Sequence, residues 1–234
     1  MGASLRPNPT NGVPAPRARQ ASSGELCAVR DDIAGLLAHD LKTPLAAISM
    51  NLDFVLDELG KEASGTMRSA LEDCRAANTR AIRIVSDMAD AVRLVSGERK
   101  VALTDVDAAS LLGGLVRAAA PEAASRGVRM VWHADAEVVR ADADLLSRAL
   151  ERLLERALRH SRAGGAIEIV LRQATVSIRV RPAPADKVER PAPESAMRAL
   201  GTYFAEAAVR AQGGAVWTET EGDGSLVFFA ALQA

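Results

Sequence analysis

Apolar residues recur in the first half of the chain at steps of four and three, the spacing of a helix that buries one face. The series runs from Ile33 to Leu59 with the regularity of a coiled-coil or bundle seam. A helix over 25–59 would be roughly 50 Å long. Gly60 and the Ser64-Gly65-Thr66 stretch then break the pattern. The sequence therefore predicts one long helix followed by a short connection.

A second apolar series predicts a second long helix. It begins at Met67 and continues to Val95, and Gly97 ends it. Two long helices joined by a short loop form a helical hairpin. A hairpin alone leaves one side of its seam in water, whereas two copies packed as a four-helix bundle bury it. We therefore expect a homodimer through the hairpin.

Beyond residue 104 the pattern changes to short strands mixed with helices. Helices are predicted over 107–126, 144–159 and 195–211, and strands over 128–133, 167–172, 175–180, 215–221 and 225–232. The last two strands form a hairpin around Gly222-Asp223-Gly224, and a proline-rich loop spans 181–193. This order predicts an α+β chain in which the hairpin precedes a two-layer α/β sandwich.

Composition and charge narrow the classes of function. The formal net charge is −1, so no overall field attracts nucleic acid or an anionic membrane. No apolar run approaches the roughly 18 residues that span a bilayer, and no signal peptide is expected. The two cysteines form no metal or disulfide pattern. We expect a cytoplasmic protein with a disordered tail over 1–22, a hairpin over 23–98 and an α/β domain over 104–234.

Candidate chemistry centres on His39. This residue lies two positions from the nearest seam residues on either side, and two steps of about 100° place it on the opposite, solvent-facing side of the helix. The adjacent Asp40 can orient the imidazole or take its proton, which makes a ring nitrogen more nucleophilic. Thr43 is one helical turn further on, on the same face. Pro44 lacks an N–H, so the carbonyl of Asp40 loses its helical partner and the helix should bend.

The segment His39-Asp40-Leu41-Lys42-Thr43-Pro44-Leu45 resembles the phospho-acceptor box of bacterial sensor histidine kinases, usually His-Glu/Asp-Leu-Arg/Lys-Thr/Ser-Pro-Leu. All seven positions fit. The resemblance implies that the hairpin dimerises as a four-helix bundle and that His39 is phosphorylated on a ring nitrogen. It also implies that Asp40 acts as a base and that Thr43 assists dephosphorylation of a partner.

The second half resembles the ATP-binding domain of the same family. Asp142 followed by Leu145 is similar to its lead-in, and residues 152–161 align with the Asn-Leu-x-x-Asn-Ala box, whose second asparagine helps hold Mg²⁺. Both asparagines fall on arginine, at Arg152 and Arg156. A guanidinium cannot ligate a cation, although it can meet a phosphate or carboxylate directly. Because both arginines border an apolar stripe, we expect a solvated helix edge.

The remaining boxes of the ATP-binding domain differ from the family pattern in this chain. Pro182 stands where the adenine-binding Asp of Asp-x-Gly-x-Gly belongs, and both glycines are absent. The family's Gly-Leu-Gly-Leu box corresponds to Ala199-Leu200-Gly201-Thr202 here, so one glycine remains. Further along the chain, residues 212–217 do resemble the family's next segment, His-Gly-Gly-x-Ile-Trp. The scaffold matches and the ligand positions do not, so we expect no cofactor on this chain and no tight binding of Mg-ATP.

Three functions stay open. The main hypothesis is histidine phosphotransfer, in which His39 exchanges a phosphoryl group with a response-regulator aspartate or receives it from a partner kinase. Any Mg²⁺ would then come with the partner's receiver domain. The second is a histidine autokinase with an atypical ATP site. The third is a non-catalytic regulator that binds a response regulator or pairs with a true kinase.

Overall fold

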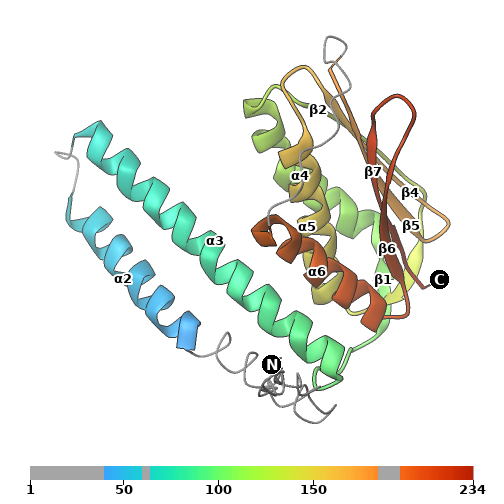
Figure 1. Ribbon diagram of the computed structural model, residues 1–234, viewed down its shortest axis with the longest axis horizontal. Helices are drawn as coiled ribbons and strands as arrows, with labels where there is room; N and C mark the ends of the chain where they lie inside the picture. Colours follow the sequence, from blue (N-terminus) through green and yellow to red (C-terminus); the bar gives the residue numbers. More distant parts are fainter. Residues whose placement is uncertain (1–39, 60–63, 184–195, 234) are drawn as a thin grey trace, which may run out of the picture.

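The computed structural model describes residues 40–59, 64–183 and 196–233, with side chains omitted for 196–201. A helical hairpin lies beside an α/β domain, and the second hairpin helix faces the helices of that domain (Figure 1). The expected tail over 1–22, His39 and most of the proline-rich loop over 181–193 lie outside the described residues.

The hairpin consists of α2 (Lys42–Glu58) and α3 (Gly65–Ser96), which run side by side in opposite directions (Figure 1). Ser64 caps α3 by accepting a hydrogen bond from the backbone N–H of Met67 at 3.3 Å. Gly97 ends α3 in the left-handed region, with φ of +77°, which glycine adopts without steric cost. The predicted helical hairpin is confirmed over these residues.

The α/β domain contains seven strands and three helices within the described residues. In chain order they are β1 (Thr104–Asp107), α4 (Ala108–Ser125), β2 (Arg129–Ala134), β3 (Val138–Ala141), α5 (Ala143–His160), β4 (Ala166–Arg172), β5 (Thr175–Arg181), α6 (Ala196–Ala211), β6 (Ala215–Thr220) and β7 (Leu226–Ala231). The main sheet has the order β2-β4-β5-β7-β6, with β2 parallel to β4 and the other pairs antiparallel. Helices α4, α5 and α6 cover one face (Figure 1), which confirms the two-layer sandwich.

A second, two-stranded sheet was not predicted. β1 pairs antiparallel with β3, and each strand has only four residues, too few to show a clear alternation. Asp107 ends β1 and caps α4, because its carboxylate accepts a hydrogen bond from the backbone N–H of Ser110 at 3.0 Å. This small sheet joins the hairpin to the main domain.

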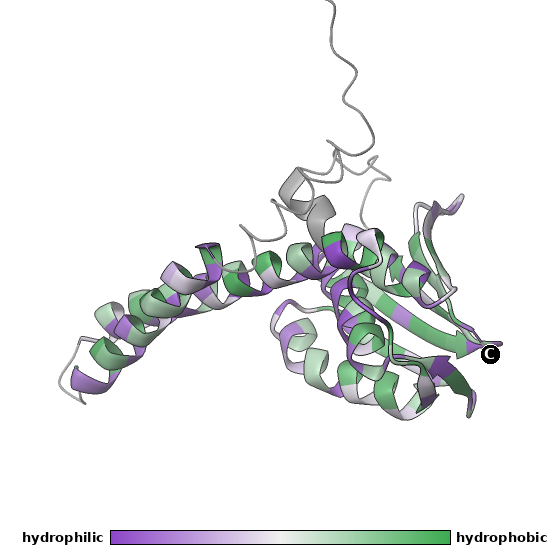
Figure 2. Cartoon of the chain, turned by 90° about the horizontal axis from the view of Figure 1, so that it is seen from below, coloured by the Kyte–Doolittle hydropathy of each residue, from purple (hydrophilic) through white to green (hydrophobic). Residues whose placement is uncertain are grey.

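Helix α5 forms the centre of the hydrophobic core. Asp142 caps it, accepting a hydrogen bond from the N–H of Leu145 at 3.2 Å, and Arg159 and His160 complement the dipole at its last turn. Its apolar face packs against the inner face of the sheet, and Figure 2 shows hydrophobic residues gathered between these layers. The largest fully buried side chains are Phe204, Phe228, Leu112, Leu145, Leu146, Leu150, Leu153, Leu158, Ile167, Ile169, Leu171 and Ile178.

Candidate functional site

The acceptor box lies at the start of the hairpin. Asp40 and Leu41 form a wider, π-type helical turn immediately before α2, and Pro44 lies in the first turn of α2. Because Pro44 has no N–H, regular helical bonding cannot continue through this point, and the widened turn accompanies that loss. The irregularity falls where the sequence predicts a bend. The side chains of Asp40 and Thr43 are exposed, and the placement of His39 is outside the described residues.

Asn78 fixes the register of the hairpin next to this box. Its amide lies buried on α3 and donates hydrogen bonds to the backbone carbonyl of Leu45 at 2.9 Å and to Ser49 Oγ at 2.7 Å. A buried amide in an otherwise apolar seam selects one alignment of two helices, because sliding either helix would leave the amide unpaired. Sequence reasoning missed Asn78, although a polar residue between apolar seam positions was a usable signal.

Arg152, which replaces the first asparagine of the nucleotide-domain box, is buried rather than solvated. Its Nε donates to Asp87 Oδ2 at 2.6 Å, and its Nη1 donates to Glu155 Oε1 at 3.1 Å. The side chains of Arg152 and Asp87 are only 8% and 5% exposed. The expectation of a solvated helix edge is therefore wrong for Arg152. The edge of α5 on which Arg152 lies faces the Asp87 carboxylate of α3. The spacing of residues within α5 cannot reveal this contact with another helix.

Arg148, one turn before Arg152, extends this contact. It donates to Asp87 Oδ1 and to Asp90 Oδ2, both at 2.7 Å, and Asp90 also lies 2.6 Å from the guanidinium of Arg99. We define the ion-pair cluster as Asp87, Asp90, Arg99, Arg148 and Arg152. It joins α3, the segment that follows α3, and α5.

Three members of the ion-pair cluster have shifted pKa values. Burial alone would raise the pKa of the Asp90 carboxyl, but hydrogen bonds from Arg99 and Arg148 outweigh it and the net pKa is lowered. Burial would lower the pKa of Arg148, but hydrogen bonds to Asp87 and Asp90 raise it above its ordinary value. The pKa of Arg152 is raised in the same way, chiefly by Asp87. These shifts favour the ionic forms of Asp90, Arg148 and Arg152.

Arg156, at the second asparagine position, is also engaged within the domain. Its Nη1 donates to Thr202 Oγ1 on α6, and its guanidinium lies 5.0 Å from the ring centroid of Phe228. A guanidinium has donors but no lone pair for a metal. The side chains at positions 152 and 156 therefore do not fit a metal-bound triphosphate in the way that the family's asparagines do.

Two further positions that correspond to family boxes, Gln212 and Pro182, lie within the described residues. Gln212 accepts a hydrogen bond from the backbone N–H of Asp142 at 2.7 Å and donates to the carbonyl of Ala208 at 2.9 Å. It thereby ties the end of α6 to the cap of α5. Pro182 follows β5 and is exposed, with no carboxylate to accept an adenine amino group. The side chains at positions 199–201 are outside the described residues.

Neither metal ligands nor a membrane helix is found in the part of the chain that the structure describes. No group of three or more His, Cys, Asp and Glu side chains there could hold a metal ion. Within 40–59, 64–183 and 196–233, no helix combines the length and the apolar character needed to cross a bilayer. Cytoplasmic location stays a prediction.

Comparisons with known proteins identify the hairpin first. Residues 29–97 match the model of the His Kinase A (phospho-acceptor) domain. Sensor protein DivL of Caulobacter vibrioides is 28% identical over 167 residues, which are 69% of this chain and 21% of that protein. Sensor protein IrlS of Burkholderia pseudomallei is 32% identical over 138 residues, 59% of this chain and 29% of that protein. Sensor-like histidine kinase SenX3 of Mycobacterium tuberculosis is 28% identical over 206 residues, which are 83% of this chain and 47% of that protein.

Solved structures extend the likeness to the α/β domain. The full-length ShkA structure in complex with AMPPNP has a TM-score of 0.63 at 21% identity, over 88% of this chain and 47% of that one. Histidine kinase AdeS of Acinetobacter baumannii has a TM-score of 0.57 at 14% identity, over 83% of this chain and 97% of that one. At these identities the likeness concerns the fold. The chain spans less than half the length of the three curated relatives named above. Residues 29–97 therefore belong to the His Kinase A (phospho-acceptor) domain family, and the chain as a whole is similar to sensor histidine kinases in sequence and in fold.

Proposed function

We propose that this chain is a phospho-acceptor protein of a two-component signalling system, with His39 as the residue that carries the phosphoryl group. The observation that carries the proposal is the match over residues 29–97 to a phospho-acceptor domain, which contains the complete seven-residue box. The curated relatives are named as sensor proteins and sensor kinases. The partner that this chemistry requires is the receiver domain of a response regulator.

The proposed transfer is a nucleophilic substitution at phosphorus. A ring nitrogen of His39 forms the new N–P bond while the P–O bond to the donor breaks, and the donor oxygen leaves with the bonding electrons. The ring proton passes to the carboxylate of Asp40, which is exposed at the start of the hairpin. We assign the Thr43 hydroxyl, also exposed, to the positioning of water when a partner is dephosphorylated.

The source of the phosphoryl group separates two candidates. The names of the relatives favour an autokinase with an atypical ATP site over a dedicated phosphotransferase. In an autokinase built on this fold, residues other than Arg152 and Arg156 would have to hold the metal, because both guanidinium groups are engaged within the protein.

A specific observation favours the phosphotransferase, which would receive its phosphoryl group from an aspartyl phosphate or from a partner kinase. Arg152 is buried in an ion pair with Asp87, so a position that serves the nucleotide in the family serves domain packing here. Phosphotransfer of this kind needs no nucleotide on this chain. It needs an exposed His39 and a hairpin surface that docks a receiver domain, whose acidic pocket brings its own Mg²⁺.

Two parallel incubations distinguish the candidates. The purified chain is incubated with γ-labelled ATP and Mg²⁺, and separately with candidate receiver domains that carry labelled aspartyl phosphate. If the chain is labelled in the incubation with ATP, the result supports the autokinase. If it is labelled only in the incubation with receiver domains, the result supports the phosphotransferase. Absence of label in both, with a full set of receiver domains from the same genome, contradicts phospho-acceptance and leaves the non-catalytic regulator.

The partner of the hairpin itself is proposed to be a second copy of the chain. An apolar row with a spacing of seven residues follows one side of α2 from its N-cap. It consists of Leu41, Ile48 and Val55, all at least 40% exposed in the single chain. Such a heptad row fits the interior of a four-helix bundle. Ile48→Glu would bury a charge there and is expected to weaken self-association at least about tenfold, as measured by analytical ultracentrifugation.

Met50→Glu is the matched control for this prediction. Met50 lies on the opposite side of α2 from Ile48 and is 72% exposed, so a charge there should leave the association constant unchanged. Equal weakening by both substitutions, or none by Ile48→Glu, would show that the heptad row is not the dimer interface.

A further inference from the structure

Asn78 is a buried polar side chain in the half of the hairpin that carries the acceptor box. Over Lys42–Glu58 and 65–86, the only buried residues of the single chain are Leu56 and Asn78. Leu56 lies well beyond the end of the box, roughly 16 Å further along the helix axis. Asn78 is therefore the buried contact that holds α2 on α3 next to the box.

The start of α2 is not fixed by its own sequence. Its N-cap, Leu41, has no side chain that accepts a hydrogen bond from the first turn, and no acidic residue lies in that turn. Pro44 removes a backbone donor, and the turn at residues 40–41 is widened. The position of the box on the hairpin therefore depends on the contact that α2 makes with α3.

Asn78 binds the box directly and uses both hydrogens of its amide nitrogen. One hydrogen bond goes to the carbonyl oxygen of Leu45, the last residue of the box, and the other goes to Ser49 Oγ, one helical turn further along α2. Two acceptors one turn apart fix both the axial position of α2 on α3 and its rotation about its own axis. Ser49 is the only serine or threonine of α2 beyond the box, so this alignment is the one that brings a hydroxyl to the amide.

We propose that Asn78 is a positioning residue for phosphoryl transfer, a role that rests on the proposed function of His39 as the acceptor. By holding Leu45 at one axial position and one rotation, Asn78 sets the direction in which the box presents the ring nitrogen to the phosphorus of the donor. In-line attack requires close alignment, and a displacement of about 1 Å can slow a reaction by about a hundredfold. In this role Asn78 itself contacts neither the donor nor the phosphoryl group.

Two donors separate positioning from the reactivity of the ring. The first is the donor that labels the parent protein, either ATP with Mg²⁺ or a phosphorylated receiver domain. Its saturating rate and half-saturating concentration are both measured. The second is phosphoramidate, a small donor that needs no docking. The N–P bond to His39 forms while the P–N bond of phosphoramidate breaks, and the ammonia that leaves takes up the ring proton.

The substitution Asn78→Leu keeps a side chain of similar size but removes both hydrogen bonds. With the parent's donor, the saturating rate should fall at least about tenfold, while the half-saturating concentration changes less than about threefold. With phosphoramidate, the rate should stay within about twofold of the parent, because a freely diffusing donor can approach the ring from any open side. Circular dichroism and analytical ultracentrifugation verify that helical content and self-association are those of the parent.

The substitution Ser49→Ala tests the same role, also if Asn78→Leu does not fold. It removes one of the two acceptors and keeps the hydrogen bond to Leu45, so the saturating rate should fall less, by about threefold. The double variant should be no slower than Asn78→Leu alone, because Ser49 acts through the amide that Asn78→Leu has already removed.

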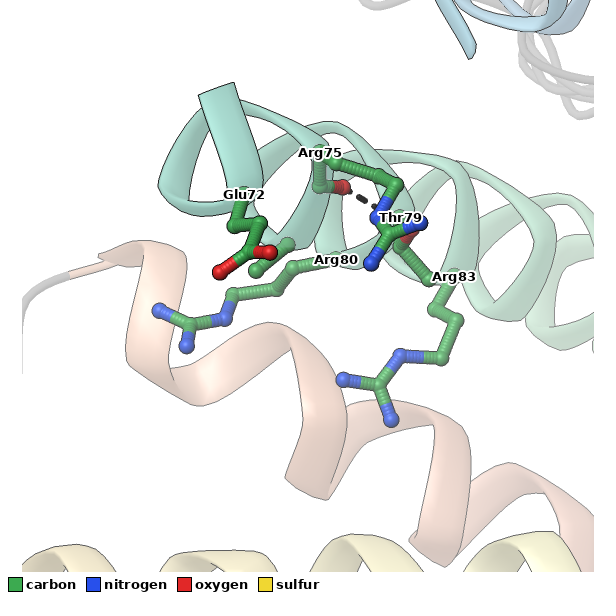
Figure 3. A pocket seen from close by; sticks show the side chains of 6 residues that line it. Glu72, Arg75, Thr79, Arg80 and Arg83 are labelled. Atoms are coloured by element: carbon green, nitrogen blue, oxygen red, sulfur yellow. Dashed lines mark hydrogen bonds between the residues drawn. The ribbon is translucent and has the colours of Figure 1, made fainter. Parts of the chain in front are cut away.

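Two polar side chains nearby are matched controls. Thr79 follows Asn78 on α3, but its hydroxyl donates to the carbonyl of Arg75 within the same helix at 2.9 Å. It lines a surface hollow on the side of α3 that faces α6 (Figure 3). Asp53 lies 3.7 Å from Arg75 across the hairpin, and both side chains are more than half exposed. Thr79→Val and Asp53→Asn should therefore keep the parent's rates with both donors.

The positioning role is overturned if folded Asn78→Leu and Ser49→Ala proteins both reach the parent's saturating rate. It is equally overturned if Asn78→Leu slows labelling by phosphoramidate as much as labelling by the parent's donor, or if either control slows transfer as much as Asn78→Leu does. If the parent chain is labelled by neither donor, the proposed function fails and this role fails with it. A parent that is labelled while Asn78→Leu matches it overturns the positioning role alone.

Discussion

Replacement of His39 by glutamine is expected to reduce phosphoryl uptake at least about a hundredfold, whichever donor supplies the group. The glutamine amide is similar in size and polarity to imidazole, but its nitrogen has no available lone pair and cannot form an N–P bond. The measurement is the initial rate of label transfer to the chain from the donor that labels the parent protein.

The other two histidines provide matched controls. His133 is exposed on β2. His160 is the last residue of α5, and its ring centroid lies 6.0 Å from that of Phe228 on β7. His133→Gln and His160→Gln should keep the parent rate. If either control loses label while His39→Gln retains it, the acceptor box has been assigned to the wrong residue.

Asp40 and Thr43 separate base catalysis from dephosphorylation in the same assay. Asp40→Asn removes the proposed proton acceptor and should slow transfer by about two to four orders of magnitude. Thr43→Ala should accept label at the parent rate, while the lifetime of a phosphorylated receiver domain mixed with it increases.

Replacement of Asp87 by alanine is expected to lower the free energy of unfolding of the α/β domain by about 3–5 kcal/mol. The loss is large because Arg148 and Arg152 stay charged and lose the carboxylate that they share. Asp90 and Glu155 remain as their other partners, but Arg152 Nε is left without an acceptor in a side chain that has almost no access to water. Urea unfolding followed by tryptophan fluorescence measures it, because both tryptophans, Trp132 and Trp217, lie in the α/β domain.

A double-mutant comparison distinguishes an unpaired charge from lost packing. The double substitution Asp87→Leu with Arg152→Met removes both charges of this pair. It should lower the free energy of unfolding far less than Asp87→Ala, because neither position then holds a buried charge that has lost its partner. Asp53→Ala, at the exposed pair with Arg75, should change stability by no more than about 0.5 kcal/mol. A cost below about 1 kcal/mol for Asp87→Ala would mean that water reaches the cluster freely.

The hairpin and the sandwich were accessible to sequence reasoning because their signals are local. The heptad spacing of α2 and α3 and the apolar stripe of α5 repeat many times, and the strands of the main sheet are six or seven residues long. The two strands of the small sheet have four residues each and were missed. The turn between β4 and β5 was equally hidden: Gln173 and Ala174 adopt φ of 51°, and their N–H groups donate to the carboxylate of Glu137 at 2.5 Å.

The candidate site divides in the same way. The acceptor box is a contiguous run of seven residues, so the sequence alone determined His39, Asp40 and Thr43 as candidates and determined that Arg152 could not ligate a metal. Only the tertiary structure decided what Arg152 does instead. Its partner Asp87 is 65 positions away, on a different domain, and no helical period relates the two. The carboxylate that pairs with a buried guanidinium is decided by how the surfaces of α3 and α5 pack against each other. That packing is a property of the whole folded chain and not of either segment alone.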